Sequence, residues 1–158
     1  MEIREIEEKD NKVMEQIIKC SLESFGLDIP GTAYFDPQLS SLAEFYKEQS
    51  KANYWVVVNE ENEVVGGVGI GPFGEKPGIG ELQKLYVTPG AQGKGLAKKL
   101  MKVALDFAKK HYTYCYIETS HKLQAANRLY SKFGFCELDK PLEGSEHKTM
   151  DRWYIKKF

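Results

Sequence analysis

A glycine-rich turn between a predicted strand and a predicted helix is the segment best suited to bind an anion. Residues 90–95 read Gly-Ala-Gln-Gly-Lys-Gly and follow a β-branched and aromatic run that ends at Thr88-Pro89. Downstream, apolar residues recur at the spacing of one helix face: Leu96, Leu100, Val103, Ala104 and Phe107. The first turn of a helix has unpaired backbone N–H groups and partial positive charge, and no Ser, Thr or Asp caps this one. The segment therefore predicts a binding site for a phosphate or pyrophosphate.

Two better-known phosphate motifs do not fit the chain. A P-loop requires Ser or Thr after Gly-Lys, but Gly95 follows Gly93-Lys94. A GxGxxG string at residues 69–74 is followed by Pro77 and Gly78, with no helical period after it, so it lacks the context of a dinucleotide-binding motif. The glycines of residues 90–95 alone also leave open an ordinary surface turn before a helix.

Three segments resemble one known family. Residues 92–97, Gln-Gly-Lys-Gly-Leu-Ala, fit the pattern Gln/Arg-x-x-Gly-x-Gly/Ala, which resembles the acyl-CoA signature of the GNAT superfamily of N-acetyltransferases. The sequence Leu-Tyr-Val-Thr-Pro at 85–89 resembles the bulged central strand of that superfamily. Residues 129–135 resemble its LYxxxGF helix end, and the pieces occur in the family's order over residues 53–137.

The resemblance implies both a fold and an activity. The fold would be α/β (α+β), one N-acetyltransferase domain over residues 1–158, with a central mixed, mostly antiparallel sheet flanked by helices and splayed at the CoA site. The activity would be transfer of an acetyl group from acetyl-CoA to a primary amine by direct attack in a ternary complex. The acceptor would be a small molecule or a peptide. A non-enzymatic acyl-CoA-binding or sensing module is the alternative.

The resemblance also assigns cofactor contacts. The backbone of Leu85, Tyr86 and Val87 would pair with the pantetheine arm, as the bulged strand does in the family. The turn and the start of the helix would hold the pyrophosphate through Gln92, Gly93, Lys94, Gly95, Leu96, Ala97 and Lys98. Many family members carry a CoA-contacting asparagine seven residues before the LYxxxGF tyrosine. This chain has Leu123 there, so Asn127 is the expected substitute.

Two residues are assigned to proton transfer by the same resemblance. An amine must lose a proton before it attacks, and the departing thiolate must gain one. Tyr130 is the expected general acid, because a phenol with a pKa of about 10 is protonated at neutral pH. Glu81, six residues before Val87, is the expected base. Tyr86 and Glu118 are the respective alternatives, and a packed aromatic and a strand-end carboxylate are the structural readings of Tyr130 and Glu81.

The composition sets the remaining expectations. A chain of 158 residues suffices for one domain with a buried core, and a net charge of −1 offers no electrostatic footprint for nucleic acid. No apolar run approaches a membrane span, and the charged N-terminus does not resemble a signal peptide. The cysteines and histidines lack metal-ligand spacing, so we expect no metal and a reducing, cytoplasmic location. A homodimer stays possible.

Periodicity and turn signals position the elements around these motifs. We expect strands at residues 2–6, 80–87, 112–119 and 150–156, and a hairpin of 54–59 with 64–70. Besides the helix after the glycine turn, we expect helices over residues 12–25, 37–49 and 124–132. Asp36 precedes Pro37 and is the expected N-cap of the second of these. The segments 27–49 and 141–153 resemble the family least and would select the acceptor.

Overall fold

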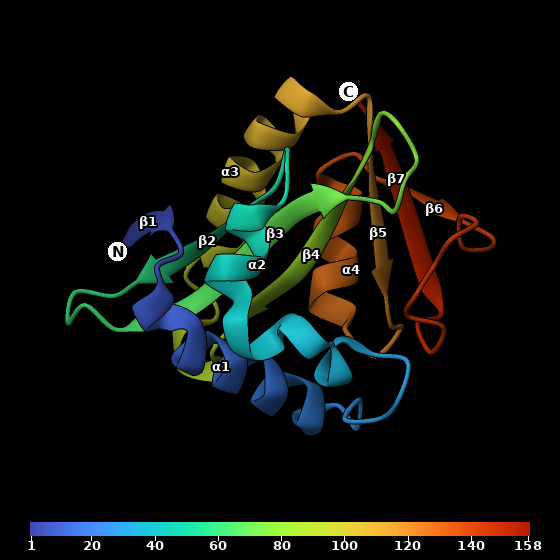
Figure 1. The fold of residues 1–158 in the computed structure, drawn as a ribbon. Helices are drawn as coiled ribbons and strands as arrows, with labels where there is room; N and C mark the ends of the chain where they lie inside the picture. Colours follow the sequence, from blue (N-terminus) through green and yellow to red (C-terminus); the bar gives the residue numbers. More distant parts are fainter.

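Seven strands form one sheet in the computed structural model, which describes all of residues 1–158 (Figure 1). Their bounds are β1 Glu2–Glu5, β2 Asn53–Val58, β3 Val64–Pro72, β4 Ile79–Val87, β5 Tyr114–Thr119, β6 Cys136–Leu138 and β7 Arg152–Lys157. The strand order is β1-β2-β3-β4-β5-β7-β6, and β4 and β5 are the only parallel neighbours. The predicted mixed, mostly antiparallel sheet is confirmed. The short edge strand β6 was not predicted.

Helices cover both faces of this sheet. Helices α1 (Asn11–Ser24) and α2 (Leu42–Glu48) lie in front of it in Figure 1, and α3 (Leu96–His111) and α4 (Gln124–Lys132) lie behind it. Side chains of a strand alternate between faces. On β2, Tyr54 and Val56 therefore join the core under α1 and α2, and Trp55 and Val57 join the core under α3. The sheet thus separates two hydrophobic cores.

The buried face of α3 is rotated from the one predicted. Its fully buried side chains are Leu96, Leu100, Met101, Ala104, Leu105 and Ala108. Val103 and Phe107, which were predicted on the same apolar face, are only partly buried and pack against the edge of this core. Phe107 packs edge-on against Trp55 at the rim, with ring centroids 5.2 Å apart. The helix carries apolar residues over a wide arc, and tertiary packing selects which part of that arc faces the sheet.

Strands β4 and β5 separate partway along their length, and we call this point the fork. They pair only from Ile79–Glu81 to Tyr114–Tyr116. Beyond Glu81, β4 keeps β3 as its neighbour but has no strand partner on the other side. In Figure 1, α4 lies behind the diverging strands. The predicted splay of the sheet is therefore present.

A β-bulge lies just past the fork. In the β3–β4 pairing, Gly67 faces Tyr86 and Gly69 faces Gln83, so both Lys84 and Leu85 oppose a single residue of β3. Lys84 adopts a left-handed backbone with a φ of 51°. Its side chain is only 5% exposed and ends 2.8 Å from a carboxylate oxygen of Asp36. The bulge that the family resemblance implied is thus present, and it turns a charged side chain inward.

Asp36 occupies the N-cap position with Pro37 after it, as predicted, but its side chain does not cap the helix. The segment after it forms a 3₁₀ turn over Pro37–Ser41 before α2 begins, and the Asp36 side chain accepts no capping hydrogen bond. Its carboxylate instead binds the Lys84 ammonium and the His147 ring, whose Nε2 lies 2.9 Å from Oδ1. A buried carboxylate gains more from a full positive charge than from a neutral backbone N–H.

Two loops far apart in the sequence are joined beside the fork. One precedes α2 and carries Asp36, and the other precedes β7 and carries His147. Thr149 adds a hydrogen bond of 2.6 Å from its Oγ1 to the carbonyl of Pro30. A Cβ on Gly31, which has a φ of 84°, would lie 2.1 Å from that hydroxyl. These are the two regions expected to select the acceptor.

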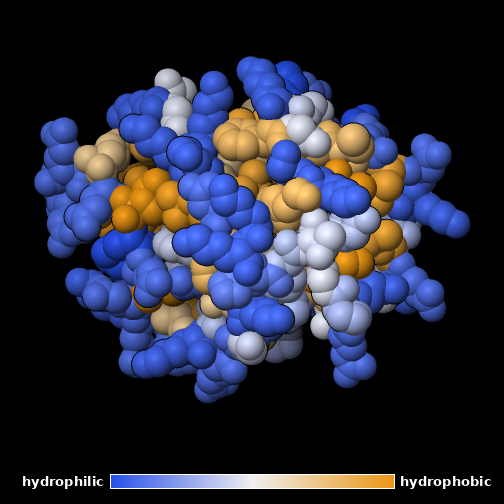
Figure 2. All heavy atoms as spheres, turned by 90° about the horizontal axis from the view of Figure 1, so that it is seen from above, coloured by the Kyte–Doolittle hydropathy of each residue, from blue (hydrophilic) through white to orange (hydrophobic).

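The surface in Figure 2 is mainly hydrophilic, with hydrophobic atoms in separate patches. None of the helices combines the length and the hydrophobicity needed to cross a bilayer.

The ion pair between the loops should make stability depend on pH. The hydrogen bond to Asp36 raises the pKa of His147 above its usual value. Burial opposes ionisation of Asp36, but the His147 hydrogen bond and the Lys84 charge still lower its pKa. A raised histidine pKa stabilises the fold fully below about pH 6.5, and the contribution is lost as the pH rises through the folded-state pKa. Replacement of His147 should therefore cost most in mildly acidic solution.

We expect His147→Gln to lower the free energy of unfolding by about 1–2 kcal/mol near pH 5.5 and by less at pH 9. Urea denaturation at both pH values measures the difference. His111→Gln is the control, because His111 is exposed and makes no ion pair. A cost for His147→Gln that is the same at both pH values would contradict the role given to its charge.

Candidate functional site

A cavity of about 730 Å³, which we call the cleft, lies along the fork. It is bounded by β4 and β5 beyond their last pairing, by the N-terminus of α3 and by α4. It brings together most of the residues selected from the sequence: Glu81, Leu85, Tyr86, Val87, Gln92, Gly93, Gly95, Leu96, Ala97, Lys98 and Tyr130. Lys94 and Asn127 are not among its lining residues.

The glycine turn presents a run of free backbone donors at one end of the cleft. The N–H groups of residues 93–98 donate to no acceptor within the protein, and no side chain caps α3. Gly93 and Gly95 have φ values of 79° and 76°, and a Cβ on either would meet no atom within 4 Å. The side-chain amide of Gln92 donates from Nε2 to the carbonyl of Val87 at 3.0 Å, and this hydrogen bond fixes the turn to the end of β4. Such an arc of N–H groups at a helix N-terminus suits a phosphate group.

The lysines near this turn have different positions. The Lys98 side chain is among the groups that line the cleft, where it can add positive charge beside the free amides. Lys94 is exposed and outside the lining. The structure therefore brings only one of the two predicted lysines to the cleft.

The side chain of Asn127 makes hydrogen bonds within the protein and does not line the cleft. Its Nδ2 donates to the carbonyls of Ser120 and Leu123, both at 2.9 Å, and its Oδ1 accepts from the Tyr154 hydroxyl at 2.8 Å. The side chain is buried and both of its polar atoms are used. The substitution of Asn127 for the family's asparagine is thus not supported by the geometry. Leu123 itself lines the cleft.

Tyr130 reaches the cleft from α4. Its ring packs against Tyr154 and Phe135, with centroids 5.5 Å and 6.2 Å away. The Tyr130 hydroxyl makes no hydrogen bond within the protein. Because every fully buried polar side-chain atom has a hydrogen-bond partner, this hydroxyl must be accessible from the cavity. Burial raises the pKa of Tyr130 well above 10, and the phenol is therefore protonated at neutral pH. Tyr86 of β4 also lines the cleft, and burial raises the pKa of its hydroxyl as well.

Glu81 is the last paired residue of β4 before the fork. Burial, and secondarily the charge of Glu118, raises the pKa of Glu81 to about 7, although Gln83, His147 and Lys84 act in the opposite direction. Its Oε1 accepts a hydrogen bond of 2.8 Å from the amide of Gln83. Its Oε2 has no partner within the protein, so it too must be accessible from a cavity. A carboxylate with a pKa near neutrality is suited to general base catalysis.

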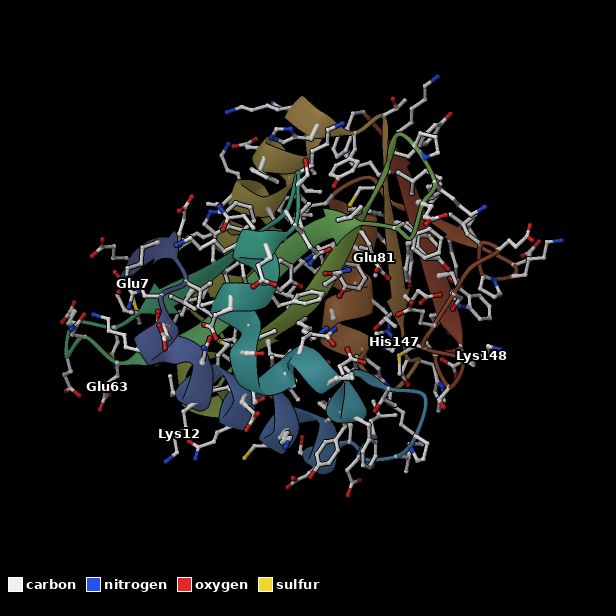
Figure 3. All side chains as sticks on the ribbon, in the orientation of Figure 1. Glu7, Lys12, Glu63, Glu81, His147 and Lys148 are labelled. Carbon is white, nitrogen blue, oxygen red and sulfur yellow. The ribbon has the colours of Figure 1, made fainter.

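A smaller cavity of about 180 Å³, which we call the chamber, adjoins the cleft at Glu81. The two share Glu81, Gln83, Lys84, Glu118 and His147 as lining residues. The rest of its lining comes from the two joined loops, from the end of β3 and the turn after it, and from α2 and its C-terminal end. Figure 3 shows Glu81 near the centre of the sheet and His147 below it, on the loop before β7. Glu81 is therefore accessible from two directions.

Several residues around Glu81 were not predicted from the sequence. Gln83 could have been found, because a residue two positions along a strand lies on the same face. Lys84 and His147 gave no such signal. Lys84 points inward only because of the bulge, and His147 lies 111 positions from the carboxylate it binds. No group of three or more His, Cys, Asp and Glu side chains is arranged to hold a metal ion.

Comparison with known proteins agrees with this geometry. Residues 15–135 match the family model described as the acetyltransferase (GNAT) family. An uncharacterized N-acetyltransferase of Escherichia coli, YjgM, is 38% identical over 148 residues, which cover 92% of this chain and 87% of that protein. An N-acetylaspartate synthetase of Xenopus tropicalis is 32% identical over 74% of this chain and 44% of that protein.

Solved structures show the same fold. A GNAT-family acetyltransferase from Staphylococcus aureus Mu50 superposes with a TM-score of 0.86 at 21% identity, over 99% of this chain and 98% of that one. An acetyltransferase from Streptococcus agalactiae 2603 gives a TM-score of 0.78 at 20% identity, with 99% and 98% covered. The match to the family model extends over the fork, the glycine turn and α4. The chain belongs to the GNAT family of acetyltransferases and is an acyltransferase enzyme.

Proposed function

We propose that this enzyme transfers an acetyl group from acetyl-CoA to a primary amine by direct attack in a ternary complex. The proposal rests on two features that lie in the same cleft. The turn with the free backbone N–H groups, of which Gly93 and residues 95–98 line the cleft, lies in its wall together with Glu81, whose pKa is about 7. The first feature suits the pyrophosphate of a CoA thioester, and the second suits an amine that must lose a proton.

Acetyl-CoA would lie along β4. The pyrophosphate would accept hydrogen bonds from residues 93–98, and Lys98 would add positive charge. The pantetheine arm would run beside Leu85, Tyr86 and Val87, where β4 has no strand partner on the side of β5. In this arrangement the arm takes the place of a neighbouring strand, and a backbone N–H of β4 would polarise the thioester carbonyl.

The acceptor amine would enter through the chamber, on the side of Glu81 away from the glycine turn. Glu81 would take a proton from the ammonium form, and the neutral nitrogen would then attack the thioester carbonyl. As the tetrahedral intermediate collapses, the C–S bond breaks and Tyr130 donates its hydroxyl proton to the departing thiolate. The nitrogen loses its extra proton to solvent, solvent returns a proton to the Tyr130 phenolate, and Glu81 releases the proton that it took from the ammonium. The products are the acetylated amine and free CoA.

A covalent cysteine route is less suitable. Cys115 is fully buried on β5, and burial raises the pKa of its thiol to about 12. A nucleophilic cysteine requires a lowered pKa and an adjacent base.

The free cysteines of the chain fit the reducing interior of a cell, and we place the enzyme in the cytoplasm on that ground.

The direct test is release of CoA from acetyl-CoA in the presence of a panel of amines: amino acids, di- and polyamines, and peptides with free N-termini or lysines. We expect turnover with at least one class and binding of acetyl-CoA in the micromolar range, about −8 kcal/mol. Binding without turnover on any amine would favour the non-enzymatic alternative.

A matched pair of variants tests the pyrophosphate site in the same assay. Gly95→Asn and Gly95→Asp introduce similar strain at a positive φ, but only the aspartate adds negative charge. Calorimetry should give at least about tenfold weaker binding of CoA for Gly95→Asp than for Gly95→Asn, a difference of about 1.4 kcal/mol. Equal affinities would contradict the site.

Tyr130→Phe tests the general acid. The ring would still pack, but no proton would reach the thiolate, so kcat should fall by about 10²-fold. The Kd for acetyl-CoA should stay nearly unchanged, because the hydroxyl acts when charge builds on sulfur. Tyr86→Phe is the comparison, since Tyr86 lines the same cleft. A parent-like kcat for Tyr130→Phe with a good acceptor, together with a loss for Tyr86→Phe, would transfer the role to Tyr86.

A further inference from the structure

Three side chains form a hydrogen-bonded relay that ends on Glu81. Tyr46 of α2 is 1% exposed, and its hydroxyl lies 2.5 Å from Oε1 of Gln83. The Gln83 amide nitrogen, Nε2, lies 2.8 Å from Oε1 of Glu81. Glu81 and Gln83 are two positions apart on β4, so they share a face of the strand.

The direction of each hydrogen bond in the relay is fixed by chemistry. An amide oxygen only accepts, so the Tyr46 hydroxyl must donate to it. That contact orients the Gln83 amide, and its NH₂ group then points at Glu81. A flipped amide would place its oxygen against the carboxylate, which is repulsive while Glu81 is ionised. The ionised carboxylate thus sets the orientation of the amide, and the Tyr46 hydroxyl, by donating to the amide oxygen, reinforces the orientation that stabilises the ionised form of Glu81.

The first member of the relay is held firmly. The Tyr46 ring packs against Tyr54 and Phe45, with centroids 5.3 Å away in both cases. Gly69 of β3 lies directly across from Gln83 in the β3–β4 pairing. A Cβ on Gly69 would lie 2.6 Å from the Tyr46 hydroxyl. Because Gly69 has no side chain, the Tyr46 hydroxyl has space to reach Gln83.

We propose that Tyr46 and Gln83 are positioning residues for Glu81: they hold Oε1 as the fixed, hydrogen-bonded oxygen and leave Oε2 to accept the proton of the acceptor amine. This rests on the proposed role of Glu81 as the base. Oε2 has no partner within the protein and is accessible from the cavities that meet at Glu81. The relay also keeps the carboxylate ionised in a place where burial favours the neutral acid.

Other charged groups act on Glu81 from the surrounding elements. Glu118 of β5 raises the pKa of Glu81, while Lys84 of the bulge and His147 of the opposite loop lower it. Asp36 binds the side chains of both Lys84 and His147, and the Tyr116 hydroxyl donates to Glu118 at 2.9 Å.

Within this set, Gln83 supplies the only hydrogen bond to Glu81 from a side chain. Loss of that donor would leave burial and Glu118 less opposed, and the pKa of Glu81 would rise.

Two variants remove the relay at different points. Gln83→Met keeps a long side chain but has no donor, and Tyr46→Phe keeps the buried ring but frees the Gln83 amide to flip. The carboxyl ¹³C chemical shift of Glu81, assigned by its loss in Glu81→Gln, gives the pKa in the free protein. We expect Gln83→Met to raise it by about one pH unit, and Tyr46→Phe to raise it by less. The acidic limb of kcat/KM should move to higher pH in parallel.

Tyr112→Phe is the matched control. It also removes the hydroxyl of a buried tyrosine, but that hydroxyl donates to the carbonyl of Lys51 at 2.6 Å, outside the relay. Its Glu81 pKa and pH–rate profile should equal those of the parent. If Tyr46→Phe does not fold, Gln83→Met still decides, because Gln83 is only partly buried.

The outcomes test the relay and the role of Glu81 as the base separately. An unchanged Glu81 pKa in Gln83→Met and Tyr46→Phe, together with a pH-dependent loss of rate in Glu81→Gln, would overturn the relay and leave the base in place. A parent-like pH–rate profile in Glu81→Gln would overturn the base itself, whatever the chemical shifts show. Raised pKa values with a matching shift of the acidic limb would support both.

Discussion

The separation of β4 from β5 after Glu81 is the constraint on which the other features of the site depend. A paired strand would use its backbone groups in the ladder and would bury its side chains against the next strand. Beyond Glu81, β4 has a neighbour only at β3, and the cleft occupies the free side. The same separation leaves Glu81 at the junction of the cleft and the chamber, where burial raises its pKa to about 7.

The two ends of the fork differ in the groups that supply their charge. At the glycine turn, free N–H groups and the dipole of α3 give partial positive charge without any ion pair. Around Glu81, charges are placed by side chains that the bulge and the two joined loops bring in. Lys84 and His147 offset Asp36, and Glu118 stays close enough to raise the pKa of Glu81. In the proposed function, the glycine turn would bind the pyrophosphate, and the groups around Glu81 would receive the amine.

The sequence predicts this fold and cleft where local patterns suffice. Strand, glycine turn and helix are contiguous, so their order and the free amides follow from residues 81–101 and from the family resemblance. The prediction failed where distant contacts decide. Asp36 occupies an N-cap position, but its carboxylate binds Lys84 and His147 instead of a backbone N–H. The side chain of Asn127 is hydrogen-bonded to Tyr154 and to two nearby carbonyls. Tyr46 lies on another element from Gln83, and no local pattern joins them.

A structure of the protein with bound acetyl-CoA tests the central claim most directly, because that claim is a position: the thioester lies in the fork. We predict that the pyrophosphate oxygens accept hydrogen bonds from the N–H groups of residues 93–98. We also predict that the pantetheine arm runs along β4 from Val87 toward Glu81, with the sulfur next to Tyr130. A pyrophosphate bound away from the glycine turn, or an arm that leaves β4 without contact, would contradict the account.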